Sequence, residues 1–304
     1  MNKCPEILAP AGNFEKMTFA VRYGADAVYG AGKDFGMRAA SENFSDDELI
    51  RAVNYCHKRN VKFYVTVNIL PHENELPALV DYLTFLENQV KPDALIVSDI
   101  GVFSLAKTYA PHIDLHISTQ SSTVNSEACK LYAAMGATRV VLAREMTLAE
   151  IRALRENIPE DLELEAFVHG AMCVSYSGRC LLSGFFTGRD ANHGKCAQPC
   201  RWEYTVGEKS AEVCEIKRPD TPLSLVEDAR CTYMFSSKDM CMIEHIPELV
   251  EAGINSFKIE GRVKSAYYTA VTANAYKNEL NRYLADKAHY TFDGDSLYEL
   301  ESVS

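Results

Sequence analysis

The chain has 304 residues, 47% of them hydrophobic, which is ordinary for one large globular domain or two small ones. Its 31 basic and 42 acidic residues give a formal charge of −11, which argues against a protein whose whole surface tracks phosphates. The N-terminal stretch MNKCPEILAPAG lacks the apolar region of a signal peptide, and no later run reaches membrane-spanning length. We therefore expect a soluble, cytoplasmic protein with no membrane partner.

Short apolar runs alternate with amphipathic segments along the chain, as in proteins built on a parallel sheet. The runs that predict strands are 6–10, 27–31, 62–68, 94–99, 115–119, 139–143, 164–170 and 256–261. The segments that predict helices between them are 13–24, 45–60, 75–90, 101–110, 125–136 and 147–158. Asn13, Ser45 and Thr147 are suitable N-caps, and Gly24 and Gly136 are suitable helix ends.

Eight strands with intervening helices predict a TIM-like (β/α)8 barrel rather than an open doubly wound sheet. Neither a dinucleotide-binding G-x-G-x-x-G nor a P-loop stands between a strand and a helix, so nucleotide-binding alternatives lose their usual support. The core is expected over residues 1–290 and a C-terminal tail over 291–304. The regular spacing breaks once, at a cysteine-rich insertion of about residues 171–236, before a predicted helix over 237–253 and the last strand.

A loop this long inside a compact domain is usually functional, and in a barrel it leaves the C-terminal face, where active sites are built. Other polar side chains stand where predicted strands end. They are Asn68, Asp99, Gln120, Arg144, His169, Glu260 and Arg262. Loop chemistry or helix capping explains any one of them better than a functional role, but their joint place on one face favours a site.

The insertion carries Cys173, Cys180, Cys196 and Cys200, with the spacing C-x6-C-x15-C-x3-C. Cytoplasmic thiols stay reduced, so clustered cysteines indicate metal binding or redox chemistry. The paired C-x2-C knuckles of zinc ribbons are missing, whereas an iron-sulfur cluster accepts looser spacing. Cys241, and after it Cys231, are alternatives for the fourth ligand.

The other cysteines, Cys4, Cys56, Cys129 and Cys214, are interpreted as structural. A single nucleophilic cysteine would need a histidine partner, and His169 and His193 are near in sequence, but several thiols exceed what that mechanism requires. Four basic residues also fall in the insertion, where they either meet a polyanion or are merely solvated: Arg179, Arg189, Lys195 and Arg201.

The stretch EAFVHGAMCVSYSGRCLLS resembles the signature of the peptidase U32 family, the collagenase-like proteases. EILAPAGNFEKMTFAVRYGADAVYG, ISTQSSTVNSEA, GRDANHGKCAQPCRWEY and SSKDMCMIEHIPELVEAGINSFKIEGRVKSAYY also resemble family segments, so the likeness covers nearly the whole chain. Within the family, the sequence from Ser177 to Tyr204 is most similar to that of proteins that hydroxylate tRNA.

This resemblance implies an oxygen-independent hydroxylase that makes 5-hydroxyuridine at the wobble position of tRNA, with prephenate as co-substrate. It implies a [4Fe-4S] cluster on Cys173, Cys180, Cys196 and Cys200. Relatives include an rRNA cytidine hydroxylase and a pair that hydroxylates ubiquinone precursors, so a paralogous subunit is a conceivable partner. Longer members continue into a β-rich module, of which residues 291–304 are expected to be the start.

For this reaction, Arg144 and Arg262 are the candidate clamps for the two carboxylates of prephenate, with Lys258 expected to point outward. Gln120, Asn68 and His169 are candidates to hydrogen-bond the base or the acid, and Glu260 or Asp99 to move a proton. Two alternatives remain: a U32-type peptidase, although neither H-E-x-x-H nor G-x-S-x-G is present, and a non-catalytic iron-sulfur partner subunit.

Overall fold

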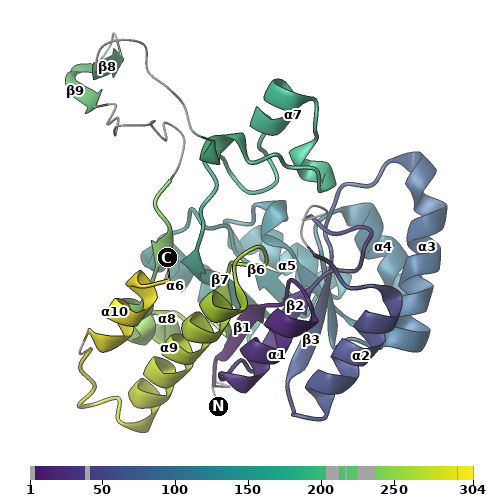
Figure 1. The fold of residues 1–304 in the computed structure, drawn as a ribbon, viewed down its shortest axis with the longest axis horizontal. Helices are drawn as coiled ribbons and strands as arrows, with labels where there is room; N and C mark the ends of the chain where they lie inside the picture. Colours follow the sequence, from purple (N-terminus) through teal and green to yellow (C-terminus); the bar gives the residue numbers. More distant parts are fainter. Residues whose placement is uncertain are drawn as a thin grey trace.

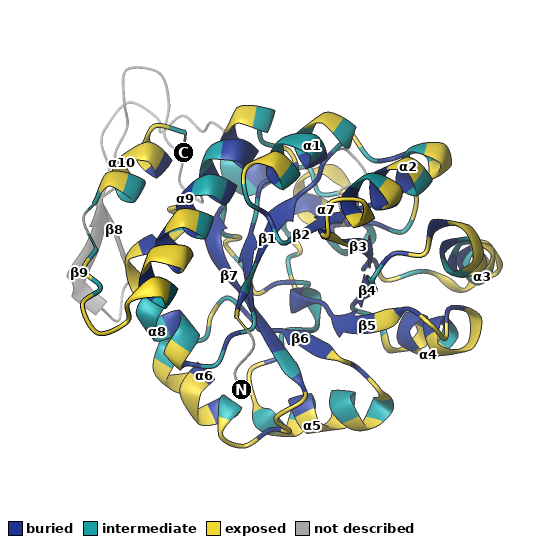
Figure 2. Cartoon of the chain, turned by 90° about the horizontal axis from the view of Figure 1, so that it is seen from below, coloured by how far each residue is buried: buried dark blue, intermediate teal, exposed yellow. Residues whose placement is uncertain are grey.

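A closed barrel of eight parallel strands, surrounded by helices, forms the body of the protein (Figures 1 and 2). The computed structural model describes residues 4–37, 42–202, 212–215, 218–224, 237–292 and 294–303. The barrel strands are β1 (Glu6–Pro10), β2 (Ala27–Gly30), β3 (Lys62–Val67), β4 (Ala94–Val97), β5 (Asp114–Ile117), β6 (Arg139–Val141), β7 (Glu163–Gly170) and β11 (Ser256–Ile259). They pair in chain order, and β11 closes the ring between β7 and β1.

All eight predicted strands and the TIM-like barrel are confirmed. Helices cover the outside: α1 (Phe14–Arg22), α2 (Asp46–His57), α3 (Leu76–Phe85), α4 (Ile100–Tyr109), α5 (Ser126–Met135), α6 (Leu148–Arg155), α8 (Ile246–Glu251), α9 (Ala266–Ala285) and α10 (Asp295–Glu301). Asn13, Ser45 and Thr147 each accept a hydrogen bond from the first turn of their helix, as predicted. Within the described ranges, no helix is both long and apolar enough to cross a membrane.

Helix α9 was not predicted, although it is the longest described helix and packs against α1 and β1. Its buried positions include Thr269, Thr272 and Glu279, so apolar periodicity does not mark its inner face. Glu279 is satisfied there by Arg282, Tyr290 and Ser296. Helix α10 packs on α9 through residues that include the buried Leu300, and the domain boundary after residue 290 stays a prediction.

The predicted helix over 237–253 is partly wrong. Met240 and Cys241 instead form β10, which pairs antiparallel with Gly170 and His169 at the end of β7. The next amide, of Met242, still donates to the Val168 carbonyl at 2.9 Å, so the pairing with β7 holds this stretch extended. Pro247 then marks the start of α8, as prolines do in the first turn of a helix. The insertion also contains α7 (Leu182–Thr187), β8 (Glu212–Glu215) and β9 (Arg218–Ser224).

The interior of the barrel holds a network of ion pairs among apolar side chains. Arg139 of β6 contacts Glu6 of β1 and both Glu163 and Glu165 of β7. Lys258 of β11 lies 2.7 Å from Glu165 and over the rings of Tyr29 and Phe167. The expectation that Lys258 points outward is therefore wrong, because its ammonium group reaches Glu165 in the interior of the barrel.

His116 of β5 is buried beside this network, edge-on to Tyr64, and its Nδ1 has no partner among the described residues. Burial, followed by the positive charges of Arg139, Lys258 and Lys62, holds the pKa of His116 well below its usual 6.5. Folded His116 stays neutral where the same residue in the unfolded chain becomes protonated. Acidification below pH 6.5 therefore favours unfolding.

We expect His116→Gln to weaken this pH dependence. Between pH 6.5 and about pH 5, the wild-type free energy of unfolding should fall by up to about 1.4 kcal/mol per pH unit more than that of the variant. Urea unfolding across this range measures both slopes. His289→Gln, at an exposed site, is the matched control, and parallel slopes for wild type and His116→Gln would contradict the assignment.

Candidate functional site at the rim of the barrel

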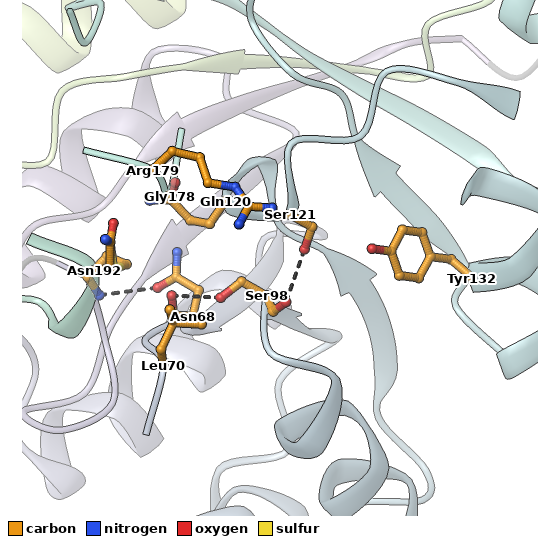
Figure 3. Close-up of a pocket in the computed structure, with 10 residues that line it drawn as sticks. Asn68, Leu70, Ser98, Gln120, Ser121, Tyr132, Gly178, Arg179 and Asn192 are labelled. Carbon is orange, nitrogen blue, oxygen red and sulfur yellow. Dashed lines mark hydrogen bonds between the residues drawn. The ribbon is translucent and has the colours of Figure 1, made fainter. Parts of the chain in front are cut away.

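A pocket of about 190 Å³ opens at the C-terminal rim of the barrel, between the ends of β3, β4 and β5 and the cysteine-rich segment, residues 171–202 (Figure 3). Figure 1 shows this segment, with α7, lying over that end of the barrel. The lining residues are Met37, Asn68, Leu70, Ser98, Gln120, Ser121, Tyr132, Gly178, Arg179 and Asn192. Two polar surfaces thus face each other, one on the rigid barrel and one on the segment.

The barrel side of the pocket is held by hydrogen bonds between successive strand ends. Ser98 donates its hydroxyl to the Asn68 carbonyl at 2.9 Å, and Ser121 donates to the Ser98 carbonyl at 3.1 Å (Figure 3). The Asn68 side chain accepts from the Met37 amide at 3.2 Å and lies 3.5 Å from Ser118. Because each rim loop is tied to the next, Asn68 is positioned before any ligand arrives.

Gln120 stands in the short 3-10 turn Thr119–Ser121 that follows β5. Its Oε1 is buried, and no described residue donates a hydrogen bond to it. A buried acceptor without a partner costs stability, and such groups usually meet a ligand or water. Gln120 therefore offers an acceptor to a donor group in the pocket.

Arg179 of the cysteine-rich segment adds positive charge to the lining of the pocket (Figure 3). Its side chain is exposed and makes no ion pair with any residue that the structure describes. A guanidinium in this state can take a phosphate or carboxylate in a bidentate manner. The sequence places Arg179 among the basic residues of the insertion but does not predict it at the site, because only the fold brings it into the same pocket as Gln120.

The cysteine-rich segment is fastened to the rim close to Gln120. Gly178 has φ +75°, and a Cβ at this position would lie 2.4 Å from the Gln120 carbonyl oxygen. Beside it, Ser122 donates its hydroxyl to the Ser177 carbonyl at 2.7 Å. Farther along, His193 contacts the Leu70 carbonyl at 3.0 Å and Glu75 at 3.1 Å. The pocket thus exists only while the segment is docked.

The four predicted ligands Cys173, Cys180, Cys196 and Cys200 all lie in this segment, exposed or half-buried. Burial raises the pKa of Cys200, and the neighbouring Cys173, Cys196 and Cys180 raise it further against the opposing charge of Arg201, so these three thiols lie within electrostatic range of Cys200. In the described ranges, no three acidic, histidine or cysteine side chains are close enough to hold a single metal ion. An iron-sulfur cluster is larger than a single ion and is usually held by four thiolates, so this donor set suits a cluster.

The alternative ligand Cys241 lies elsewhere, on β10, where its thiol is 3.9 Å from the Tyr276 hydroxyl of α9. Cys231 lies outside the described residues, as does the side chain of Cys214. Cys56 and Cys129 are buried, as expected for structural cysteines, and burial raises the pKa of Cys56 to about 12 and that of Cys129 to about 11. Cys4 is exposed.

The remaining predicted site residues do not all gather at the pocket. Arg144 donates to the Ala171 carbonyl at 2.9 Å and lies 3.7 Å from Glu260, so this pair supports the start of the segment. Arg262 is buried, with a guanidinium nitrogen 3.5 Å from Thr66 of β3. Asp99 caps α4 by accepting from the Val102 amide at 3.0 Å.

His169 lies on the outer side of β7, between the rings of Tyr268 and Tyr276 of α9. The pairing of β7 with β11 shifts by one residue just before His169, and this irregularity turns its side chain away from the interior. Burial lowers the pKa of His169 to about 4, so the imidazole is neutral near pH 7. Its position is that of a packing residue behind the rim.

We expect Gly178→Ala to loosen the docked segment without unfolding the barrel. The added methyl meets the Gln120 carbonyl, and a non-glycine residue at this φ costs about 1–2 kcal/mol. Limited trypsin digestion should therefore cut the segment several-fold faster, while thermal unfolding of the core changes little. Gly184→Ala, where a Cβ meets nothing within 4 Å, is the matched control. Equal digestion rates would show that the contact does not hold the segment.

Comparison with known proteins agrees with this architecture. A protein named tRNA hydroxylation protein P1, from Bacillus subtilis, is 39% identical over 304 residues, which are 100% of this chain and 69% of that protein. A 23S rRNA 5-hydroxycytidine synthase from Escherichia coli is 36% identical across 93% of this chain and 40% of its own. A protein named collagenase, from Porphyromonas gingivalis, is 34% identical across 91% and 66%.

A solved structure of a U32 peptidase superposes with a TM-score of 0.54 over 84% of this chain and 93% of its own, at 13% identity, which supports the fold alone. The model of peptidase family U32 matches residues 12–304, nearly the whole chain. The chain belongs to peptidase family U32.

Proposed function

We propose that this protein hydroxylates RNA, and specifically C5 of the wobble uridine of tRNA, with the target base held in the rim pocket. The observation that carries the proposal is that an unpartnered Gln120 acceptor and the Arg179 cation line the same small pocket. Two relatives support the proposal: the chain is 39% identical to a tRNA hydroxylation protein and 36% identical to an rRNA hydroxycytidine synthase.

A base inside a stack or duplex cannot reach such a pocket, so the target uridine must be unstacked, as in a single-stranded loop. The N3–H of uracil is a donor flanked by two carbonyl acceptors. In the proposed pose it donates to Gln120 Oε1, and the Asn68 amide is placed to meet a neighbouring carbonyl.

Replacing the C5–H bond by a C5–OH bond oxidises the base by two electrons, so the oxygen donor must be reduced by two. We propose prephenate, an alcohol with two carboxylates, as that donor: its C–O bond breaks, its oxygen goes to C5, and the hydrogen from C5 replaces the lost hydroxyl. Arg179, rather than the predicted Arg144 or Arg262, is the arginine at the pocket and would hold a carboxylate there.

Cys173, Cys180, Cys196 and Cys200 would hold the [4Fe-4S] cluster, because all four lie in the docked segment and three of the thiols are within electrostatic range of the fourth, Cys200. When bound, the cluster would supply one-electron chemistry beside the pocket. The chain's own residues do the rest: the rim amides orient the base, and the docked segment excludes water from it. A paralogous subunit and a cytoplasmic location stay predictions.

The proposed reaction is tested by nucleoside mass spectrometry of tRNA from a host that lacks its own wobble hydroxylases and expresses this chain. We expect 5-hydroxyuridine with the wild type and about a fivefold loss with Gln120→Ala, since one hydrogen bond contributes about 1 kcal/mol. Gln89→Ala, at an exposed site on the helical layer, is the matched control and should leave the product unchanged.

Absence of 5-hydroxyuridine with folded, iron-loaded wild-type protein would overturn the proposal. The collagenase-named relative makes gelatin cleavage the informative second assay. Cleavage by the same preparation, lost in Gln120→Ala, would assign the pocket to a peptidase instead.

The ligand set is tested by iron and sulfide analysis of anaerobically purified alanine variants. We expect Cys173→Ala, Cys180→Ala, Cys196→Ala and Cys200→Ala each to lose iron and the broad absorption near ~400 nm. Cys241→Ala should retain both, because its thiol faces Tyr276 rather than the other four. Loss of iron in Cys241→Ala with retention in Cys200→Ala would show that Cys241, and not Cys200, is the fourth ligand.

A further inference from the structure

The cysteine-rich segment exposes aromatic side chains that the rim pocket does not use. Phe185 is 82% exposed, Phe186 44% and Trp202 39%. In the described ranges, every other phenylalanine is less exposed than Phe185 and Phe186. Exposed apolar groups that gather in one place, instead of being scattered singly, indicate an interaction surface.

These three residues form what we call the aromatic platform. The ring centroids of Phe185 and Phe186 are 5.2 Å apart, and those of Phe186 and Trp202 are 6.1 Å apart. The indole N–H of Trp202 donates to the Ala197 carbonyl at 3.1 Å, which fixes the orientation of its ring. Two of the residues belong to α7 and the third follows the last cysteine, so the platform is preformed by packing within the segment.

The charge around the platform is opposite to that of the protein as a whole. The chain has a formal charge of −11, yet residues 171–202 contain four basic residues and one acidic residue. Arg189 and Lys195 are both exposed, and Arg189 Nε donates to the Lys195 carbonyl at 3.0 Å, which keeps these two residues side by side. The aromatic platform thus belongs to a segment with a net positive charge on an otherwise acidic molecule.

The platform and the rim pocket are parts of one docked unit. The Ala197 amide donates to Ser183 of α7 at 2.9 Å, and Asn192 lies 3.5 Å from the Cys180 carbonyl, so contacts within the segment link its two ends. Arg179 and Asn192 of the same segment line the pocket. A chain bound on the platform can therefore continue into the pocket over the surface of a single structural element.

We propose that the aromatic platform binds unpaired bases of the RNA next to the target nucleotide, with Arg189 and Lys195 contacting the backbone phosphates. The inference rests on the proposed function and adds to it the surface that holds the single-stranded flanks. Aromatic rings beside basic residues are the usual means of binding single-stranded nucleic acid, since every base has a face that stacks. An apolar protein partner would pack on the rings, but it would not account for the positive charge of residues 171–202.

The chain contains a single tryptophan, Trp202, so fluorescence excited selectively at the indole, beyond the absorption of the tyrosines, reports on the platform alone. The first probe is an anticodon stem-loop RNA with an unpaired uridine at the wobble position, titrated into the anaerobically purified full chain. We expect saturable quenching of the Trp202 emission. A blunt RNA duplex of equal length should quench much less, because it has no unpaired base to stack. Equal quenching by both RNAs would overturn the proposal.

Affinity for labelled stem-loop, measured by fluorescence anisotropy, tests the individual rings. Phe185→Ala should weaken binding about tenfold, whereas Phe185→Tyr and Trp202→Phe, which keep a ring, should bind nearly as the wild type does. Tyr298→Ala removes a ring that is 77% exposed on α10 and should change nothing. Circular dichroism and iron content confirm that each variant is folded and loaded.

Unchanged affinity in both Phe185→Ala and Trp202→Ala would overturn the platform, and a protein partner on this surface would become the better explanation. The two proposals fail separately. RNA binding and quenching without 5-hydroxyuridine would overturn the proposed reaction but support the aromatic platform. Hydroxylation by the wild type, with normal RNA affinity in the ring variants, would support the reaction but overturn the platform.

Discussion

The ion-pair network centred on Arg139 is the interaction on which the rest of the molecule depends. Strand β6 has only three residues, yet it must join β5 to β7 before the ring can close. Arg139 adds side-chain bonds to the short backbone pairing by reaching carboxylates on β1 and β7, while Lys258 brings in β11. Burying these charges is costly, and removing any one would leave its partners uncompensated, so the network specifies one closure of the barrel.

The closed barrel fixes where the strand ends lie, and the rim pocket follows from that. Asn68, Ser98 and Gln120 come from three consecutive strands, and their hydrogen bonds join them into one continuous wall. The opposite wall is a long insertion fastened by a few contacts, chiefly the Gly178 backbone on Gln120. The rigid part of the protein thus orients a ligand, and the attached part covers it and carries the thiols.

The sequence predicts the barrel well because the strand runs are short, apolar and regularly spaced. It also predicts Asn68 and Gln120, since residues just after parallel strands share one rim. It could not predict the outward turn of His169, which depends on a register shift between β7 and β11. Helix α9 was not predicted because its buried face includes threonines and a glutamate. Arg179 was not predicted at the site because only the docking of the segment brings it into the pocket with Gln120.

The uneven distribution of charge has a consequence for the kinetics of encounter. Over most of its surface the acidic body repels a polyanion, whereas the cysteine-rich segment attracts it. An RNA that binds as proposed would therefore be oriented before contact, so that unproductive collisions are disfavoured and the productive face is met more often than in random encounter. Added salt would screen the repulsion together with the attraction. Both the orientation of an approaching polyanion and its affinity would therefore weaken as the ionic strength rises.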